Sequence, residues 1–247
     1  ESLEKKNIIH TKRFLVIENK NNIEAEIKRA NNIEKRNTHH EVELVLNNSN
    51  FQINDPISEI SLLIKQNNRD DLVIDSIMPI FIHNDKIIYN FHERNLFPAG
   101  NEFRNFDSRS IRYYSSRINN IIIDSNNISI DLFSDVSRAF NEYISISDLN
   151  GNFIINKQES WDSHLEAEYT NVRFSLIENR NIDNKNIYIL GRFNNWKKEN
   201  KYKLHYNKTS RKYETNLFLK QGYYNYLYQL NDPLLINYIE GNHYETQ

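Results

Sequence analysis

Apolar and polar residues alternate along most of this chain, in short runs that are separated by turn-forming residues. The run Glu41-Val-Glu-Leu-Val-Leu46 is the clearest case, because every second side chain is apolar. Successive side chains of a strand point to opposite faces, so such a run predicts a strand with one buried face. Tyr and Phe, which favour strands, are also frequent. The pattern therefore predicts an all-β protein.

Runs of this kind occur throughout the first two thirds of the chain. Segment 21–34 is ambiguous, since Ile23 and Ile27 also fit helical spacing, and we interpret it as a strand. Residues 92–110 contain a proline and a glycine and are expected to form a long structured loop. The predicted strands are 11–18, 21–34, 41–46, 57–66, 72–82, 86–91, 112–117, 120–124, 139–147 and 152–156.

A tight turn is expected at Asp148-Leu-Asn-Gly151, between two strand-like runs. Both central residues of a common hairpin turn need positive φ angles, which Asn and Gly tolerate. We therefore predict a hairpin that joins strands 139–147 and 152–156.

From residue 167 onwards, the predicted strands follow one another at regular spacing, after a polar linker at 157–166. Several short strands separated by turn residues indicate a β-sandwich. In the last strand Tyr224, Tyr226 and Tyr228 share one face, which we interpret as a buried face. The predicted strands here are 167–176, 187–191, 201–206, 213–219 and 223–230. We therefore predict consecutive β-sandwich domains, of which the last is immunoglobulin-like.

Charge and composition argue against several classes of protein. The 31 Lys and Arg residues are mixed with 33 Asp and Glu residues, whereas a nucleic-acid-binding protein needs a concentrated basic face. No apolar run approaches the roughly 20 residues of a membrane-spanning helix, so no direct membrane span is expected. The chain has no cysteine, which excludes disulfides and thiolate metal sites.

Motifs for catalysis or cofactor binding are not evident. The five glycines are too far apart for a phosphate-binding loop, and the adjacent His39 and His40 would point to opposite faces of a strand. Asp70, Asp71 and Asp107 are the nearest acid–base candidates, and we interpret them as turn residues or ion-pair partners. We therefore predict no catalytic residue, no metal and no cofactor. A hydrolase with a scattered site is a minor alternative.

The stretch Gly100-Asn-Glu-Phe-Arg-Asn-Phe-Asp-Ser-Arg109 combines aromatic, basic and acidic residues within ten positions. In one interpretation it is a bracing loop, in which Arg104 and Arg109 pair with Glu102 or Asp107. In the other it docks a partner protein, because Phe and Arg are typical interface anchors. The candidate partner-binding residues are Asn101, Glu102, Phe103, Arg104, Phe106, Asp107 and Arg109.

A second distinctive stretch is Ile187-Tyr-Ile-Leu-Gly-Arg-Phe-Asn-Asn-Trp196. It resembles the opening of the glycogen-binding family of immunoglobulin-like (E-set) modules, in which the matching Trp stacks on a sugar ring. That resemblance gives Trp196 and Asn194 as candidate residues for binding glucans. Those modules use a second Trp after a later strand, and here Tyr238 is the nearest aromatic residue. The alternative is that the motif only closes the sandwich.

Short strings along nearly the whole chain resemble the plug protein family of the type IX secretion system. The most specific are Asn-Glu-Phe-Arg and Lys-Gln-Gly-Tyr-Tyr-Asn-Tyr, in this order and spacing. The strings are Lys12-Arg-Phe-Leu-Val-Ile-Glu-Asn19, Arg36-Asn-Thr-His-His-Glu41, Gln66-Asn67, Asn95-Leu-Phe97, Gly100-Asn-Glu-Phe-Arg-Asn-Phe-Asp107, Asp148-Leu-Asn-Gly151, Leu219-Lys-Gln-Gly-Tyr-Tyr-Asn-Tyr226 and Glu240-Gly-Asn-His-Tyr-Glu-Thr246.

This resemblance implies a non-enzymatic periplasmic protein that closes the periplasmic opening of a giant outer-membrane β-barrel translocon. The barrel is the expected partner, with one copy of the plug for each translocon. The resemblance also implies a division into a tail strand of an earlier immunoglobulin-like domain (1–20), a β-sandwich domain (21–157) and an immunoglobulin-like domain (158–247). The last of these is expected to lack its final strand. A carbohydrate-binding module is the alternative function.

Overall fold

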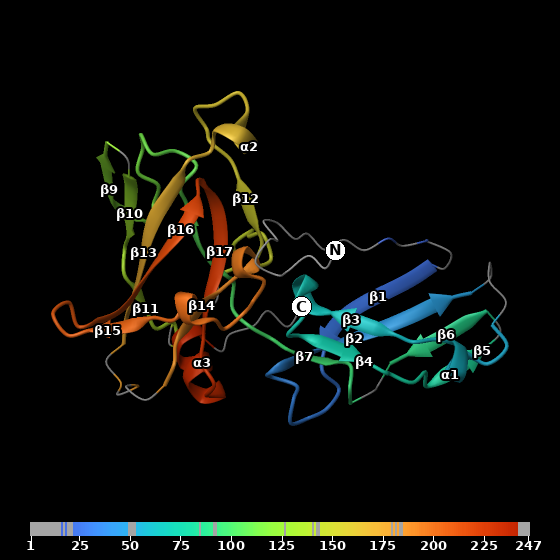
Figure 1. The fold of residues 1–247 in the computed structure, drawn as a ribbon. Coiled ribbons are helices and arrows are strands. Elements are labelled where there is room, and N and C mark those ends of the chain that lie inside the picture. The colour runs from blue at the N-terminus through green and yellow to red at the C-terminus, as the bar shows by residue number, and fades with distance from the viewer. Residues whose placement is uncertain are drawn as a thin grey trace, which may run out of the picture.

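A computed structural model shows a molecule built mainly of strands, in two lobes joined by residues 99–103 (Figure 1). The expected all-β sandwich fold is confirmed. The structure describes residues 16, 18, 22–48, 53–83, 85–90, 93–125, 127–139, 141, 144–178, 180, 182 and 185–241. The predicted strand 11–18 and the tail 1–20 lie almost wholly outside these residues, as do residues 242–247.

The N-terminal lobe has a main sheet with the strand order β1-β2-β6-β5, and β7 also pairs with β2. A second, two-stranded sheet is made of β3 and β4. The core between these sheets includes Leu44, Leu46, Ile87 and Tyr89. The elements of this lobe are β1 (Asn22–Arg29), β2 (His39–Asn47), α1 (Pro56–Glu59), β3 (Leu63–Lys65), η2 (Gln66–Asn68), β4 (Val73–Asp75), β5 (Phe81–His83), β6 (Lys86–Tyr89) and β7 (Leu96–Pro98).

The C-terminal lobe is a sandwich of a six-stranded and a four-stranded sheet. One sheet has the order β15-β16-β13-β10-β9, with β11 on β13, and the other has the order β12-β17-β14, with β8 on β17. Its elements are β8 (Arg104–Asp107), β9 (Ile118–Asp124), β10 (Asn127–Leu132), β11 (Asp135–Val136), β12 (Phe153–Ile155), α2 (Ser163–Glu166), β13 (Tyr169–Ile177), β14 (Tyr188–Leu190), η3 (Arg192–Asn194), η4 (Asn200–Tyr202), β15 (His205–Asn207), β16 (Lys212–Lys220), β17 (Gly222–Gln229) and α3 (Pro233–Glu240).

Aromatic rings fill the core of this sandwich. Tyr224, Tyr226 and Tyr228 on β17 are all buried, which confirms the interpretation of their shared face. Phe106 on β8 is fully buried and stacks on Tyr224, with 5.0 Å between the ring centroids. Strand β8 is therefore a core strand, although residues 92–110 were expected to form a loop.

Sheet pairing places the division between the lobes at residues 99–103, and the expected boundary between 157 and 158 is wrong. Strands on both sides of residue 157 belong to the same sheets: β8 and β12 pair with β17, and β10 pairs with β13. The physical reason is that strands distant in sequence become neighbours in a sandwich. The polar stretch 157–166, expected to be a linker, connects β12 to β13 and contains α2.

Two predicted strands of the N-terminal lobe are interrupted. Segment 57–66 begins as α1, because the Asp55 side chain accepts a hydrogen bond from Ile57 N (3.2 Å) and Pro56 opens the helix. Segment 72–82 divides into β4 and β5 around Ser76, which has a φ of 55°. A residue with positive φ lies outside the β region, so the regular strand is interrupted there.

The predicted hairpin at 148–151 is wrong, although the turn itself forms. Asn150 and Gly151 have φ angles of 51° and 79°, as expected for these residue types. Strand β12, however, pairs with β17, and 144–147 is not a strand. Segment 112–117 likewise forms bends and turns and no strand.

Within the described part of the chain, no helix combines the length and the apolar character needed to cross a bilayer.

Candidate functional site

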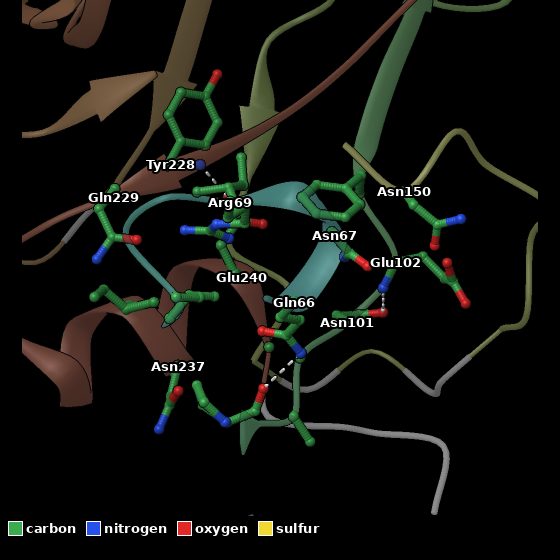
Figure 2. Close-up of a pocket in the computed structure, with 18 of the residues that line it drawn as sticks. Gln66, Asn67, Arg69, Asn101, Glu102, Asn150, Tyr228, Gln229, Asn237 and Glu240 are labelled. Carbon is green, nitrogen blue, oxygen red and sulfur yellow. Dashed lines mark hydrogen bonds between the residues drawn. The ribbon is translucent and has the colours of Figure 1, made fainter. Parts of the chain in front are cut away.

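A cleft of about 570 Å³ lies where the two lobes meet (Figure 2). The N-terminal lobe contributes the end of β1, the start of β2 and the loop around η2. The C-terminal lobe contributes β17, α3 and the turn at residues 148–150, and the connection 99–103 lies between them. The lining residues used below are Ile27, Gln66, Asn67, Arg69, Asn101, Glu102, Phe103, Arg138, Asp148, Asn150, Tyr228, Gln229, Asn237 and Glu240.

The floor of the cleft rests on a buried cluster of charges centred on Arg104. Its guanidinium donates to both carboxylate oxygens of Glu240 (3.0 and 3.2 Å from Nε) and to Asp135 (3.0 Å from Nη1). Burial alone would lower the pKa of Arg104, but the charges of Glu240 and Asp135 outweigh it and raise the pKa. Arg104 therefore stays charged, and it joins α3 to β8 and β11.

The Asp135 carboxylate accepts hydrogen bonds from four side chains outside its own strand. It accepts from Arg117 Nη2 (2.6 Å), Tyr226 Oη (2.7 Å) and Tyr228 Oη (2.8 Å), in addition to Arg104. Burial raises the pKa values of both tyrosine hydroxyls well above their ordinary value, and the charge of Asp135 raises them further. Both phenols thus remain protonated as donors.

Because the pKa values of these two tyrosines are raised, we predict that the protein loses stability at alkaline pH. The free energy of unfolding should fall as the pH rises above about 10, because unfolded tyrosines lose their protons there while folded Tyr226 and Tyr228 keep theirs. Below that pH both states are protonated and the contribution is fully present. Urea unfolding across this pH range measures the effect, and Tyr226→Phe should reduce the slope. A slope that is unchanged in Tyr226→Phe and in Tyr228→Phe would contradict this prediction.

The connection between the lobes is fixed by the C-terminal lobe. Phe103 N donates to Asp148 Oδ2 (3.1 Å), and Arg138 Nη1 donates to the carbonyl oxygen of Glu102 (2.8 Å). Arg138 also pairs with Glu240, so the connection and α3 share one anchor. The cleft wall is therefore tied to the buried charge cluster.

The lobes touch through an arginine that lies on a tryptophan ring. Arg69 Cζ is 4.1 Å from the ring centroid of Trp196, and Asp71 orients the guanidinium through two hydrogen bonds (2.7 and 3.0 Å). Arg192 Nη1 also donates to the carbonyl oxygen of Asn68 (3.2 Å). These contacts close one side of the cleft, and Asp71 is an ion-pair partner, as predicted.

The candidate partner-binding residues divide into three groups. Asn101, Glu102 and Phe103 line the cleft. Arg104 and Phe106 are buried and brace the fold. The other two residues pair with each other, since Arg109 donates to Asp107 at 2.9 and 2.6 Å, as the bracing interpretation expects. The expected pairing of Arg104 within its own loop is wrong, because its partners lie on β11 and α3.

Trp196 and Asn194 are both buried inside the Gly191–Trp196 segment. Asn194 Oδ1 accepts from Gly191 N (3.1 Å) and Trp196 N (3.2 Å), which holds the turn. The Trp196 ring packs against Phe103 and Gly151 as well as Arg69. At 5% exposure it has no free face for a sugar, and its observed role is to join the lobes.

Sequence reasoning missed the residues that build the cleft floor. Asp135 and Glu240 contact Arg104 from positions 31 and 136 residues away, and Arg138 joins the cluster through Glu240, so no local spacing marks these residues. The one available signal was the concentration of charged residues in the stretch around Arg104. Among the residues that the structure describes, no group of three or more His, Asp or Glu side chains could hold a metal ion.

Comparison with known proteins adds a structural similarity. No protein-family model matches this chain, and no curated protein matches it. A crystal structure of a hypothetical protein from Parabacteroides merdae is similar, with a TM-score of 0.83 and 30% sequence identity. The match covers 92% of this chain and 58% of that protein, so this chain spans little more than half of its length.

Proposed function

We propose that this chain is a non-enzymatic, protein-binding subunit that plugs the periplasmic opening of the giant β-barrel translocon of the type IX secretion system. The family resemblance of the sequence strings supports the partner and the periplasmic location. The feature of the molecule that supports protein binding is the outer edge of the N-terminal lobe.

That edge exposes large apolar side chains. Strand β5 ends the main sheet and pairs only with β6 within the described residues. Met78, Ile80, Phe81 and Ile82 on and before β5 are 38 to 58% exposed. An apolar edge strand invites pairing with another chain, and natural proteins usually cover or charge it. We name these four residues the β5 edge, and we propose that it contacts the translocon.

Capture of the barrel from outer-membrane extracts of the source bacterium tests the proposal. The tagged chain should recover a very large barrel protein in about equal amount. Phe81→Ser together with Ile82→Ser should reduce recovery about tenfold or more, because truncating central apolar anchors typically costs 2 kcal/mol or more. Recovery without a large barrel would refute the proposed partner.

The matched control is Phe218→Ser on the C-terminal lobe. Phe218 is as exposed as Phe81, at 63% against 58%, but lies on β16. Its replacement should leave barrel recovery unchanged. Equal losses from both variants would show that the β5 edge is not the contact.

A further inference from the structure

Carboxamide side chains surround the cleft between the lobes from several directions. Figure 2 shows Gln66 and Asn67 from the N-terminal lobe opposite Gln229 and Asn237 from the C-terminal lobe. Asn101 and Asn150 complete the set at one end of the cleft. Six neutral amides in one cavity form a lining that can both donate and accept hydrogen bonds.

Three of these amides are available for a ligand. The side chains of Asn67, Asn150 and Asn237 form no hydrogen bond with the described residues. Asn67 and Asn150 both have a φ of 51°, a conformation that asparagine adopts more readily than most residues, so the backbone alone can explain asparagine at these two positions. The backbone does not explain asparagine at position 237. Asn237 is exposed in the middle of α3, and asparagine is a poor helix former.

The arginines that line the cleft are paired with carboxylates, and Asp148 accepts hydrogen bonds from the backbone nitrogens of Phe103 and Asn150. Arg69 is paired with Asp71, and Arg138 is paired with Glu240. A charged ligand would have to compete with these pairs, whereas a neutral polar ligand would not. The cleft volume of about 570 Å³ lies within the usual range for ligand sites.

A neutral polar ligand could be a sugar or a polypeptide backbone, and the aromatic residues decide between them. Sugar sites offer an exposed ring face, but the Tyr228 ring is fully buried and the Phe103 ring packs against Trp196. Carboxamides carry the same donor and acceptor groups as a peptide bond. An extended segment presents such groups at regular intervals of about 3.3 Å per residue.

We propose that the cleft binds an extended polypeptide segment of a partner protein, through hydrogen bonds from Asn67, Asn150 and Asn237 to its backbone. Ile27 and Phe103 are apolar lining residues, which can contact uncharged side chains of the segment. This inference goes beyond the plug proposal, because it assigns a separate site and holds for any protein that presents such a segment.

Selection from a random dodecapeptide phage library tests the inference. Wild-type chain should enrich peptides that the double variant Asn67→Gly, Asn237→Ala does not retain. Glycine keeps the positive φ at position 67, and alanine favours the helix at position 237, so both changes remove an amide without straining the backbone. Enriched peptides, synthesised with a fluorescein label, should bind the double variant at least tenfold more weakly by fluorescence polarisation.

The matched control is Asn216→Ala, which removes an exposed amide on β16 outside the cleft. It should leave peptide affinity unchanged. Enrichment of no peptide, or of peptides that bind the double variant equally well, would overturn the inference. Binding of maltoheptaose in place of peptides would also overturn it. The plug proposal is tested with variants of the β5 edge, and the cleft proposal is tested with variants of Asn67 and Asn237. Either proposal can therefore fail while the other stands.

Discussion

Asp135→Ala is expected to lower the free energy of unfolding by about 3–5 kcal/mol, the usual cost of removing one partner from a buried ion pair. The change leaves the Arg104 guanidinium buried with only Glu240 to compensate it, and it removes the acceptor of the Tyr226 and Tyr228 hydroxyls. Urea or thermal unfolding followed by circular dichroism measures the loss.

Asp131→Ala provides the control for this prediction. Asp131 pairs with Arg173 on the neighbouring strand, but the Arg173 side chain is half exposed. Such a pair contributes about 0–1 kcal/mol, so the control should unfold close to wild type. Similar losses for both variants would show that the buried cluster contributes no more than a surface ion pair.

Phe106→Ala is expected to cost about 3–5 kcal/mol, as large-to-small changes of buried aromatic residues do. Its ring is fully enclosed and contacts the rings of Phe174, Tyr224 and Tyr226. The measurement distinguishes the two interpretations of this stretch, because a docking residue would lose partner binding and little stability.

Phe218→Ala is the comparison for the aromatic change. Phe218 is largely exposed and stacks on Tyr169 on the outer face of the sheet. Its truncation should cost clearly less than that of Phe106. If the two variants unfold at the same denaturant concentration, the claim that Phe106 is a core residue is wrong.

Alternation predicted the long strands β2, β13, β16 and β17 well because one face of each is more deeply buried than the other. Strands β2, β13, β16 and β17 all lie within a residue or two of their expected positions. Strand β8 escaped prediction because it is short and because one of its inward side chains is a charged arginine. In a sequence, an arginine indicates a surface position, and only its distant ion-pair partners show that it is buried.

The candidate site was only partly predictable for the same reason. The connection residues Asn101, Glu102 and Phe103 were identified from local composition. The opposing walls come from the η2 loop, β17 and α3, and only the three-dimensional fold brings these segments together. Likewise, the sequence offered Trp196 only as a sugar-binding candidate or as part of a motif that closes the sandwich, because its contact with Arg69 depends on a lobe that is distant in sequence.

The position of Trp196 beneath Arg69 gives the molecule its own optical probe. The chain contains two tryptophans, and Trp161 is fully exposed whereas Trp196 is 5% exposed. With Trp161 replaced by Phe, the remaining indole emission would come from the contact between the lobes alone. Soluble quenchers such as iodide could then report whether a bound partner separates the lobes.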